Sequence, residues 1–328
     1  MLTANSVHLL GAALLLATCG LHQHTAKAQW LPSNPIRIMV PTAPSTPPDI
    51  ISRVIATELN REEGWRVVVE NRPGAVMTIA GSEVLRQPAD GTSIYAMSVP
   101  VTAAPAFLPN IPFQLEKDFS PVVKVATSYN VLVVHPSVPA KSLSDLVELL
   151  KRQPDKLTFS SGGFGTPAHL IGEMFKLKTG ARATHVPYQQ FPQAIADLVN
   201  GTNQFMFITT LPVVDLISSG KLRALAVTGP KRLPVLPDTP TIVEQGFPDL
   251  VVEDWVGFAV RNGTPDDAIR RLNTAINRAL VKPSVREAFG KLGAEPAGGT
   301  PKAYGELIDA QLTHWAKVVQ ESGIKMHQ

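Results

Sequence analysis

Residues 158–170, TFSSGGFGTPAHL, bring together two serines, three glycines and a histidine around a Thr-Pro pair. Three kinds of chemistry use residues of these types. They are nucleophilic catalysis by a serine with a histidine base, binding of a dinucleotide by a glycine-rich loop, and binding of an anion by backbone N–H groups. Each kind makes a different demand on the neighbouring residues, so the sequence can be compared with all three.

Nucleophilic catalysis on an α/β scaffold requires the motif G-x-S-x-G, which places the serine on a strained turn between a strand and a helix. The run FSSGG lacks the first glycine, and the motif occurs nowhere else in the chain. His169 and Asp197 could complete a triad with Ser161, but their spacing does not test this arrangement. A hydrolase that uses Ser161 and His169 is therefore the weaker alternative, and we expect a protein that is not an enzyme.

Binding of a dinucleotide is suggested by Gly163, Gly165 and Ala168, which match the fingerprint G-x-G-x-x-A between a strand and a helix. The fingerprint also needs an acidic residue about 20 positions further on, where it binds the ribose. The run THVPYQQ, residues 184–190, stands at that place and contains no Asp or Glu. We therefore expect no nucleotide cofactor.

Binding of an anion needs the fewest assumptions. Thr166 is a favoured residue for the N-cap of a helix, and Pro167 suits the first helical position. The glycines allow the main chain to approach a ligand closely, and the free N–H groups at a helix start attract negative charge. A plain turn with a helix cap, and with His169 packed locally, would use the same residues. Their combination favours an anion site, and we expect a carboxylate there.

Strand-like and helix-like patterns alternate along the rest of the chain, which predicts an α/β fold with largely parallel sheets. Such sheets bind ligands at the carboxyl ends of their strands, next to helix starts. The informative loops are therefore 41–49, 71–78, 160–169 and 187–192. The strand-like runs are IRIMV (36–40), WRVVVE (65–70), SIYAM (93–97), VLVV (131–134), LTFSS (157–161), THVPY (184–188), QFMFI (204–208) and LRALAVT (222–228).

The composition excludes one class of partner. The 328 residues carry a formal charge of only +3, with 17% charged residues and no long basic run. A nucleic-acid-binding protein depends on clustered Lys and Arg to neutralise phosphates, so we expect no nucleic-acid partner. With 44% hydrophobic residues, the chain is long enough to form two ordinary domains.

The N-terminus has the pattern of an export signal. Residues 9–17 form an apolar run that is too short to span a bilayer, and Ala26-Lys27-Ala28 is a small-x-small cleavage site. We expect residues 1–28 to be a signal peptide, so that the mature, periplasmic chain begins at Gln29. A lipoprotein anchored at Cys19 is the alternative. Cleavage after Ala28 removes this single cysteine and leaves no thiol or disulfide.

Several longer motifs resemble the solute receptors of tripartite tricarboxylate transporters, the Bug family of periplasmic binding proteins. They are VVVENRPGA (67–75), DFSPVVKVA (118–126), HVPYQQFPQAIADLVNG (185–201), GKLRALAVTGPKRLPVLPDTPTIVEQGFP (220–248) and DWVGFAV (254–260). The resemblance implies a two-lobed, type II periplasmic binding protein, or Venus flytrap, with two sheets and two crossovers at the hinge. One lobe would comprise residues 29–128 plus 252–328, and the other residues 129–251.

The resemblance also implies a function. Receptors of this family bind small organic acids and deliver them to integral-membrane permease subunits, so we expect such a ligand, such a partner and a monomer. A ligand sensor that signals to a histidine kinase would use the same fold, and the sequence does not separate the two roles.

The family's ligand-binding loop in the second lobe, residues 161–170 here, is intact. Its counterpart in the first lobe, residues 44–49 here, is changed. The usual P-G-G run is replaced by a run that contains two further prolines, Pro47 and Pro48, and Val76 and Met77 stand where two glycines are usual. On this resemblance the ligand-binding residues are Ser45, Thr46, Asp49, Ser161, Gly163, Gly165, Thr166, His169 and Tyr188.

These changes have a physical meaning. Thr46 and Asp49 have the spacing of a capping box, which would satisfy the helix start internally. Pro47 and Pro48 remove two N–H donors, and Asp49 adds a like charge. We therefore expect a ligand with one carboxylate and an apolar, aromatic or neutral polar remainder. Neutral drift of the loop is the alternative interpretation.

Overall fold

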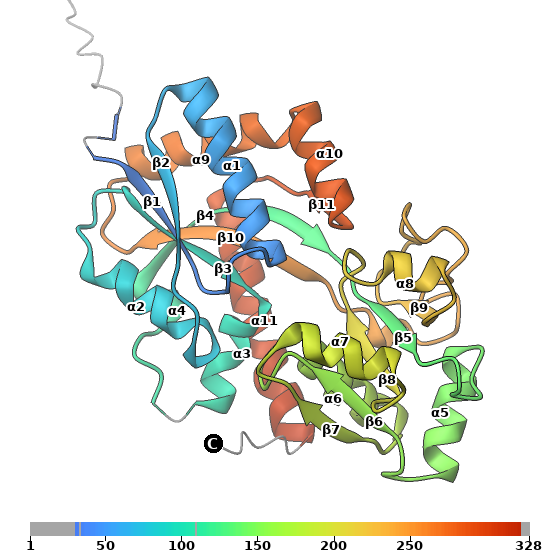
Figure 1. Cartoon of the computed structure of the whole chain (residues 1–328). Coiled ribbons are helices and arrows are strands. Elements are labelled where there is room, and N and C mark those ends of the chain that lie inside the picture. The colour runs from blue at the N-terminus through green and yellow to red at the C-terminus, as the bar shows by residue number, and fades with distance from the viewer. Residues whose placement is uncertain (1–29, 33, 109, 323–328) are drawn as a thin grey trace, which may run out of the picture.

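The computed structural model describes residues 30–32, 34–108 and 110–322. The expected signal peptide, residues 1–28, and Cys19 therefore lie outside the described residues. The chain folds into two α/β lobes, each built on its own sheet (Figure 1). Of the helices in the described ranges, none has both the length and the apolar character that a bilayer span requires.

The sheet of the first lobe has six strands in the order β11–β4–β10–β3–β1–β2. β1 pairs in parallel with β2 and β3, whereas β10 is antiparallel to β3 and β4, and β11 is antiparallel to β4. The strands are β1 (Ile36–Val40), β2 (Val67–Asn71), β3 (Ser93–Ser98), β4 (Phe119–Ser128), β10 (Asp254–Arg261) and β11 (Ala294–Pro296).

The sheet of the second lobe has five strands in the order β7–β6–β8–β5–β9. β6 is parallel to β7 and β8, whereas β5 is antiparallel to both of its neighbours. The strands are β5 (Val131–Val134), β6 (Thr158–Ser161), β7 (Thr184–Pro187), β8 (Phe205–Ile208) and β9 (Arg223–Val227).

The expected two crossovers are confirmed, because the chain passes between the sheets from β4 to β5 and again from β9 to β10. Most strands in each sheet run in one direction, as expected. The described strands that oppose this direction are β10 and β11 in the first sheet and β5 in the second. β5 and β10 are the strands that follow the two crossovers, so the hinge accounts for most of the departure from parallel order.

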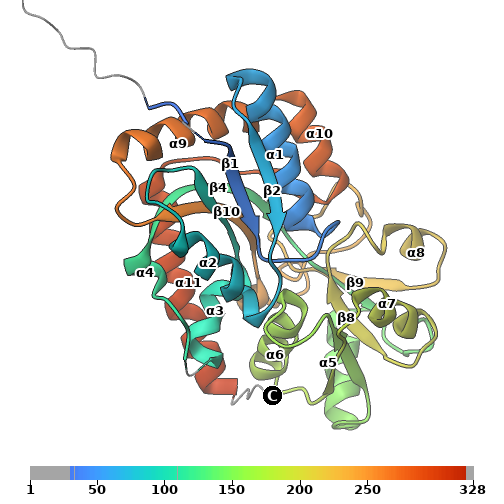
Figure 2. The same ribbon diagram turned by 60° about the vertical axis from the view of Figure 1, so that its left-hand side comes forward.

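Helices cover both faces of each sheet (Figure 2). Figure 1 shows α1, α9 and α10 on one side of the first sheet, with α2, α3 and α11 on the other. The longer helices are α1 (Pro47–Glu63), α2 (Thr78–Arg86), α3 (Val99–Phe107), α5 (Leu143–Arg152), α6 (Pro167–Thr179), α7 (Phe191–Val199), α9 (Asp266–Leu280), α10 (Pro283–Lys291) and α11 (Pro301–Ser322). The shorter ones are η1 (Ala75–Met77), α4 (Leu115–Asp118), α8 (Val214–Ser218) and η2 (Pro248–Leu250).

Alternate residues of the strands enter different cores. In β3, Ile94 and Ala96 join the cluster beneath α1 and α9, whereas Tyr95 and Met97 join the cluster that contains Trp315 of α11. Successive side chains of a strand point to opposite faces, so a strand that is buried throughout requires cover on both sides. The second of these clusters continues into the second lobe, and α11 contacts α6 there.

Candidate ligand-binding site

A cavity of 240 Å³ lies between the two lobes. Its walls come from the loops after β1, β2 and β3, from the two hinge segments, from the end of β8, and from the loops that precede α6 and α7. The lining residues are Thr42, Thr46, Pro47, Pro48, Ile51, Met77, Ser98, Ser128, Asn130, Gly162, Thr166, Pro167, Ala168, Phe191, Phe207, Ile208, Thr209, Asp254 and Val256.

Five helices begin at this cavity. Thr46, Met77, Ser98 and Thr166 are the N-caps of α1, α2, α3 and α6, and Phe191 is the first residue of α7. None of the described lining residues is Lys, Arg or His. The attraction for an anion therefore comes from backbone N–H groups and helix dipoles, which favour negative charge at helix starts, together with the neutral hydroxyl and amide donors of the lining.

The threonines at two of these starts use their hydroxyl groups in the same way. Thr166 Oγ1 donates to the Gly163 carbonyl oxygen at 2.7 Å, and Thr46 Oγ1 donates to the Ala43 carbonyl oxygen at 2.8 Å. Neither side chain caps a helix N–H group. The expected Thr46 cap is therefore not formed, because the Thr46 hydroxyl lies against the Ala43 carbonyl oxygen and 2.6 Å from the Thr42 hydroxyl, and not against a helix N–H group.

The two helix starts differ in the donors that remain. The first three residues of α6 are Pro167, Ala168 and His169, and two of them carry an N–H group. The first three residues of α1 include two prolines, so that only Asp49 contributes an N–H group there. Since early N–H groups have no partner within their own helix, α6 offers the stronger anion site.

Ser161 and His169 shape the loop from behind the cavity. Ser161 Oγ lies 2.7 Å from His185 Nε2 and accepts from the Gly163 N–H group at 3.1 Å. His169 Nδ1 accepts from the Gly165 N–H group at 3.1 Å, and its ring stacks on His185 with centroids 4.3 Å apart. Both predicted residues are buried and neither lines the cavity.

The hydrolase alternative required Ser161 and His169 to act together. Ser161 is instead paired with His185, and it is fully buried. A nucleophile must reach the reacting carbon of its substrate, and this serine faces a packed histidine pair. The geometry gives Ser161 a role in holding the Gly163 backbone.

The histidine pair is neutral at ordinary pH. Burial, followed by the nearby charges of His185 and Lys176, lowers the pKa of His169 from 6.5 to about 3. Burial and the charge of Lys176 lower the pKa of His185 to about 4. The unfolded chain therefore binds more protons than the folded protein below pH 6.5, and stability must fall as the pH decreases through this range.

We expect His169→Gln to remove part of this acid sensitivity. From pH 7 to pH 5 the wild type should lose about 2 kcal/mol of stability relative to the variant, because only the wild-type imidazole gains a proton on unfolding. Urea unfolding of both proteins at the two pH values measures the difference. A stability difference that stays constant between pH 7 and pH 5 would contradict the assignment.

Asp49 lies behind the first-lobe loop, not in the cavity lining. Its carboxylate accepts from the Ser45 N–H group at 2.9 Å, from Arg53 Nε at 3.0 Å and from Asn71 Nδ2 at 2.9 Å. Although burial opposes ionisation, the bonds from Arg53 and Asn71 hold the pKa of Asp49 below its ordinary value. The Asp49 charge is thus paired. The capping-box prediction placed the Asp49 carboxylate on the N–H group of Thr46, whereas in the structure it accepts from the N–H group of Ser45.

Tyr188 also lies outside the cavity lining. Its hydroxyl donates to Asp197 Oδ2 at 2.6 Å and accepts from Asn203 Nδ2 at 2.5 Å. These bonds tie the end of β7 to α7. Of the nine predicted site residues, the structure brings Thr46 and Thr166 to the cavity itself, and the others support its loops.

The loop 75–77 crosses from one lobe towards the other. Ala75, Val76 and Met77 have φ angles of 45°, 48° and 74°, which residues with a side chain rarely adopt. Val76 reaches the second lobe, where a Cβ atom on Gly165 would lie 2.9 Å from Val76 Cγ1. Met77 lines the cavity, and its carbonyl oxygen accepts from the Tyr95 hydroxyl at 2.7 Å. Of the two altered positions, Val76 therefore contacts the second lobe and Met77 forms part of the cavity wall.

Sequence reasoning missed the hinge residues Asn130 and Asp254, which also line the cavity. Asp254 begins the motif DWVGFAV, and the family resemblance places it next to the second crossover without giving it a role in binding. The fold adds that both residues line the same cavity.

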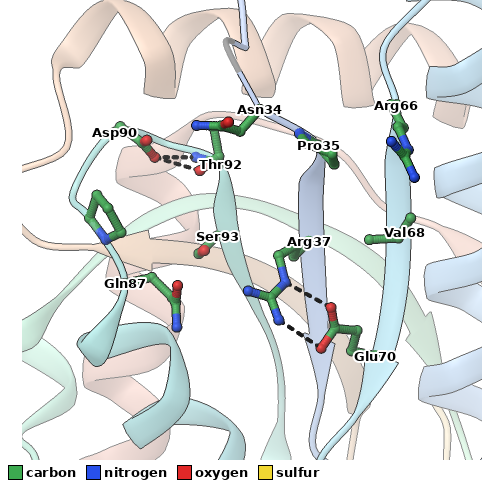
Figure 3. A pocket seen from close by; sticks show the side chains of 11 residues that line it. Asn34, Pro35, Arg37, Arg66, Val68, Glu70, Gln87, Asp90, Thr92 and Ser93 are labelled. Carbon is green, nitrogen blue, oxygen red and sulfur yellow. Dashed lines mark hydrogen bonds and ion pairs between the residues drawn. The ribbon is translucent and has the colours of Figure 1, made fainter.

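A second cavity, of 470 Å³, lies at the amino ends of β1–β3 (Figure 3). Arg37 and Glu70 face each other in it, with the Arg37 Nε–Glu70 Oε1 distance at 2.7 Å, and Asp90 binds Thr92. Ligands of this kind of sheet bind at the opposite, carboxyl ends. We therefore assign the binding site to the smaller cavity between the lobes.

Two α/β lobes, a double crossover and a small cavity between helix starts define a solute-binding protein of the periplasmic type. The sequence matches the family described as tripartite tricarboxylate transporter family receptor over residues 51–324, and the chain belongs to this family.

Related proteins align with this chain over nearly its whole length. The Bordetella pertussis protein BugT is 34% identical over 315 residues, which cover 95% of this chain and 96% of BugT. A structure of an R. palustris protein with adipate is 31% identical, with a TM-score of 0.81, covering 90% of this chain and 99% of that one. MatC from Rhodopseudomonas palustris with bound malate is 28% identical, with a TM-score of 0.78, covering 88% of this chain and 100% of MatC.

Proposed function

We propose that the protein is a non-enzymatic receptor that captures a small organic acid in the cavity between its lobes. The observation that carries the proposal is the convergence of five helix starts on a cavity whose described lining has no basic side chain. Such a cavity attracts an anion through backbone N–H groups, helix dipoles and neutral side-chain donors. The adipate and malate bound to two structural relatives support a carboxylate ligand.

In this proposal the start of α6 binds the ligand carboxylate. The N–H group of Ala168 donates to it, the positive end of the α6 dipole attracts it, and Gly162 allows the main chain to approach it. Ser161, Gly163, Gly165 and the His169 ring hold this loop in shape through their internal hydrogen bonds. Charge-assisted bonds of this kind contribute roughly 1.5–3 kcal/mol each.

A thermal-shift screen of carboxylates, aromatic acids and amides tests the proposal. A ligand present at 100 times its dissociation constant should add about 2.7 kcal/mol to the stability. We expect at least one acid of the panel to stabilise the protein and its methyl ester not to do so, because the ester cannot accept charge-assisted bonds. Equal stabilisation by acids and esters, or none by any acid, would contradict a carboxylate receptor.

We also propose export to the periplasm with cleavage after Ala28, and delivery of the ligand to membrane permease subunits by a monomeric receptor. The family membership supports both points. The intact mass of periplasmic material distinguishes a chain starting at Gln29 from one lipidated at Cys19. For the lobes we propose the division 29–128 plus 252–328 and 129–251, which the sheet membership of the strands supports.

A further inference from the structure

Two polar side chains line the cavity on its hinge side, and binding of a carboxylate at the start of α6 gives neither of them a role. They are Asn130, which lies between β4 and β5, and Asp254, the first residue of β10. Asp254 is opposite Ser128 in the antiparallel pair of β10 and β4, and Asn130 lies two positions beyond Ser128. Alternation along the strands puts Asp254 and Ser128 on one face of this pair, whereas Asn130 lies beyond the end of β4 and its backbone pairs with Thr228. Val256 and Ser128 on the same face also line the cavity.

Asn130 has a fixed backbone and a free side chain. Its N–H group donates to Thr228 Oγ1 at 2.9 Å, and its carbonyl oxygen accepts from the Thr228 N–H group at 2.8 Å. The residue is only 2% exposed, and within the described part of the chain its Nδ2 has no hydrogen-bond partner. A buried amide nitrogen without an acceptor is costly, so a ligand acceptor would satisfy a group that the fold leaves open.

Asp254 is a hydrogen-bond acceptor that lacks a cationic partner among the residues that the structure describes. Its Oδ1 accepts from the Trp255 N–H group at 2.9 Å, and no cation of the described chain pairs with it. The neighbouring Glu253 is bonded instead to Lys124. Burial, and to a smaller extent the charge of Glu253, raises the pKa of Asp254 to about 7 although the Trp255 N–H group opposes the change. A ligand N–H group would stabilise its ionised form, whereas a ligand carboxylate would oppose it.

We propose that Asn130 and Asp254 form a donor–acceptor subsite for a carboxamide at the end of the ligand remote from its carboxylate. The amide oxygen accepts from the Asn130 side chain, and the amide N–H group donates to Asp254. A second carboxylate at this place satisfies Asn130 but faces the Asp254 carboxylate. The subsite rests on the proposed function, because it selects among acids that the start of α6 already binds.

The test compares adipate with its monoamide, which differ in one terminal group, by calorimetry at pH 8, where Asp254 is mostly ionised. We expect the monoamide to bind the wild type at least ten-fold more tightly. Asp254→Asn should reverse the preference, since it removes the negative charge and adds an N–H donor for the second carboxylate. Asn130→Ala should weaken the monoamide about ten-fold.

Glu253→Gln is the matched control, because it removes one negative charge at the adjacent residue, which does not line the cavity. We expect it to leave the ratio of the two affinities within about two-fold of the wild type. Thermal melts verify that each variant is folded. Carboxylate binding with an unchanged ratio in Asp254→Asn overturns the subsite and leaves the proposed function in place, whereas a wild type that binds neither probe nor any acid of the screen overturns both.

Discussion

Replacing Gly165 by valine should lower the affinity for the tightest acid of the screen about 100-fold. Gly165 has a φ angle of 76°, and a side chain there meets Val76 Cγ1 of the other lobe at 2.9 Å. A left-handed conformation costs a residue with a side chain roughly 1–2 kcal/mol, and an overpacked contact roughly 1–3 kcal/mol more. The contact forms between the lobes, so its cost falls on the closed, ligand-holding arrangement. Titration calorimetry measures the affinity.

Gly180→Val is the control for this prediction. Gly180 ends α6 with a φ angle of 66°, so valine suffers a similar backbone strain there. The nearest atom to its added Cβ is Lys151 Cε at 4.0 Å, and the position lies away from the cavity. We expect both variants to melt at a lower temperature but only Gly165→Val to lose affinity. Comparable affinity losses in the two variants would mean that strain in α6, and not contact between the lobes, is responsible.

The alternating pattern predicted most of the fold because its segments have clear periods. The strand IRIMV was expected at the residues where β1 lies, and the strand VLVV was expected at the residues where β5 lies. The helix α3 was not predicted. Its sequence VPVTAAPAF contains Pro100 and Pro105 and is apolar on every side, so it shows no helical period. Burial between the first sheet and α11 stabilises it instead.

The candidate site was predicted only in part, because some of its residues are adjacent in sequence and others are not. Thr166 and its glycines form a local signal, since the cap, the proline and the loop are adjacent in sequence. The supporting roles of Ser161 and His169 could not be predicted from neighbouring residues, because both side chains contact His185, which lies in the next strand. Asn130 and Asp254 line one cavity only because the two crossovers bring both hinge segments to it. Sequence patterns carry no information about such pairs.

The second prediction with a large expected effect concerns the part of the cavity wall that the first lobe forms. We expect succinate and glutarate to bind at least ten-fold more weakly than acids with one carboxylate and an apolar, aromatic or neutral polar remainder. A second carboxylate near α1 would meet Pro47 and Pro48, which have no N–H groups, and the thioether side chain of Met77. Each missing charge-assisted bond is worth roughly 1.5–3 kcal/mol, which corresponds to ten-fold or more in affinity.

The proline at the second helical position offers a direct test, because Pro48→Ala restores one N–H donor at the start of α1 without adding a charge. We expect this variant to bind succinate several-fold more tightly than the wild type and to bind benzoate unchanged, because benzoate presents no second carboxylate to the restored donor. Pro283→Ala makes a similar change at the start of α10, away from the cavity, and should alter neither affinity. Calorimetric titrations of the three proteins with both acids give the result. Tight binding of succinate by the wild type, with benzoate bound weakly or not at all, would show that the altered loop still accepts a carboxylate and that the substitutions at 47, 48, 76 and 77 have not changed the ligand.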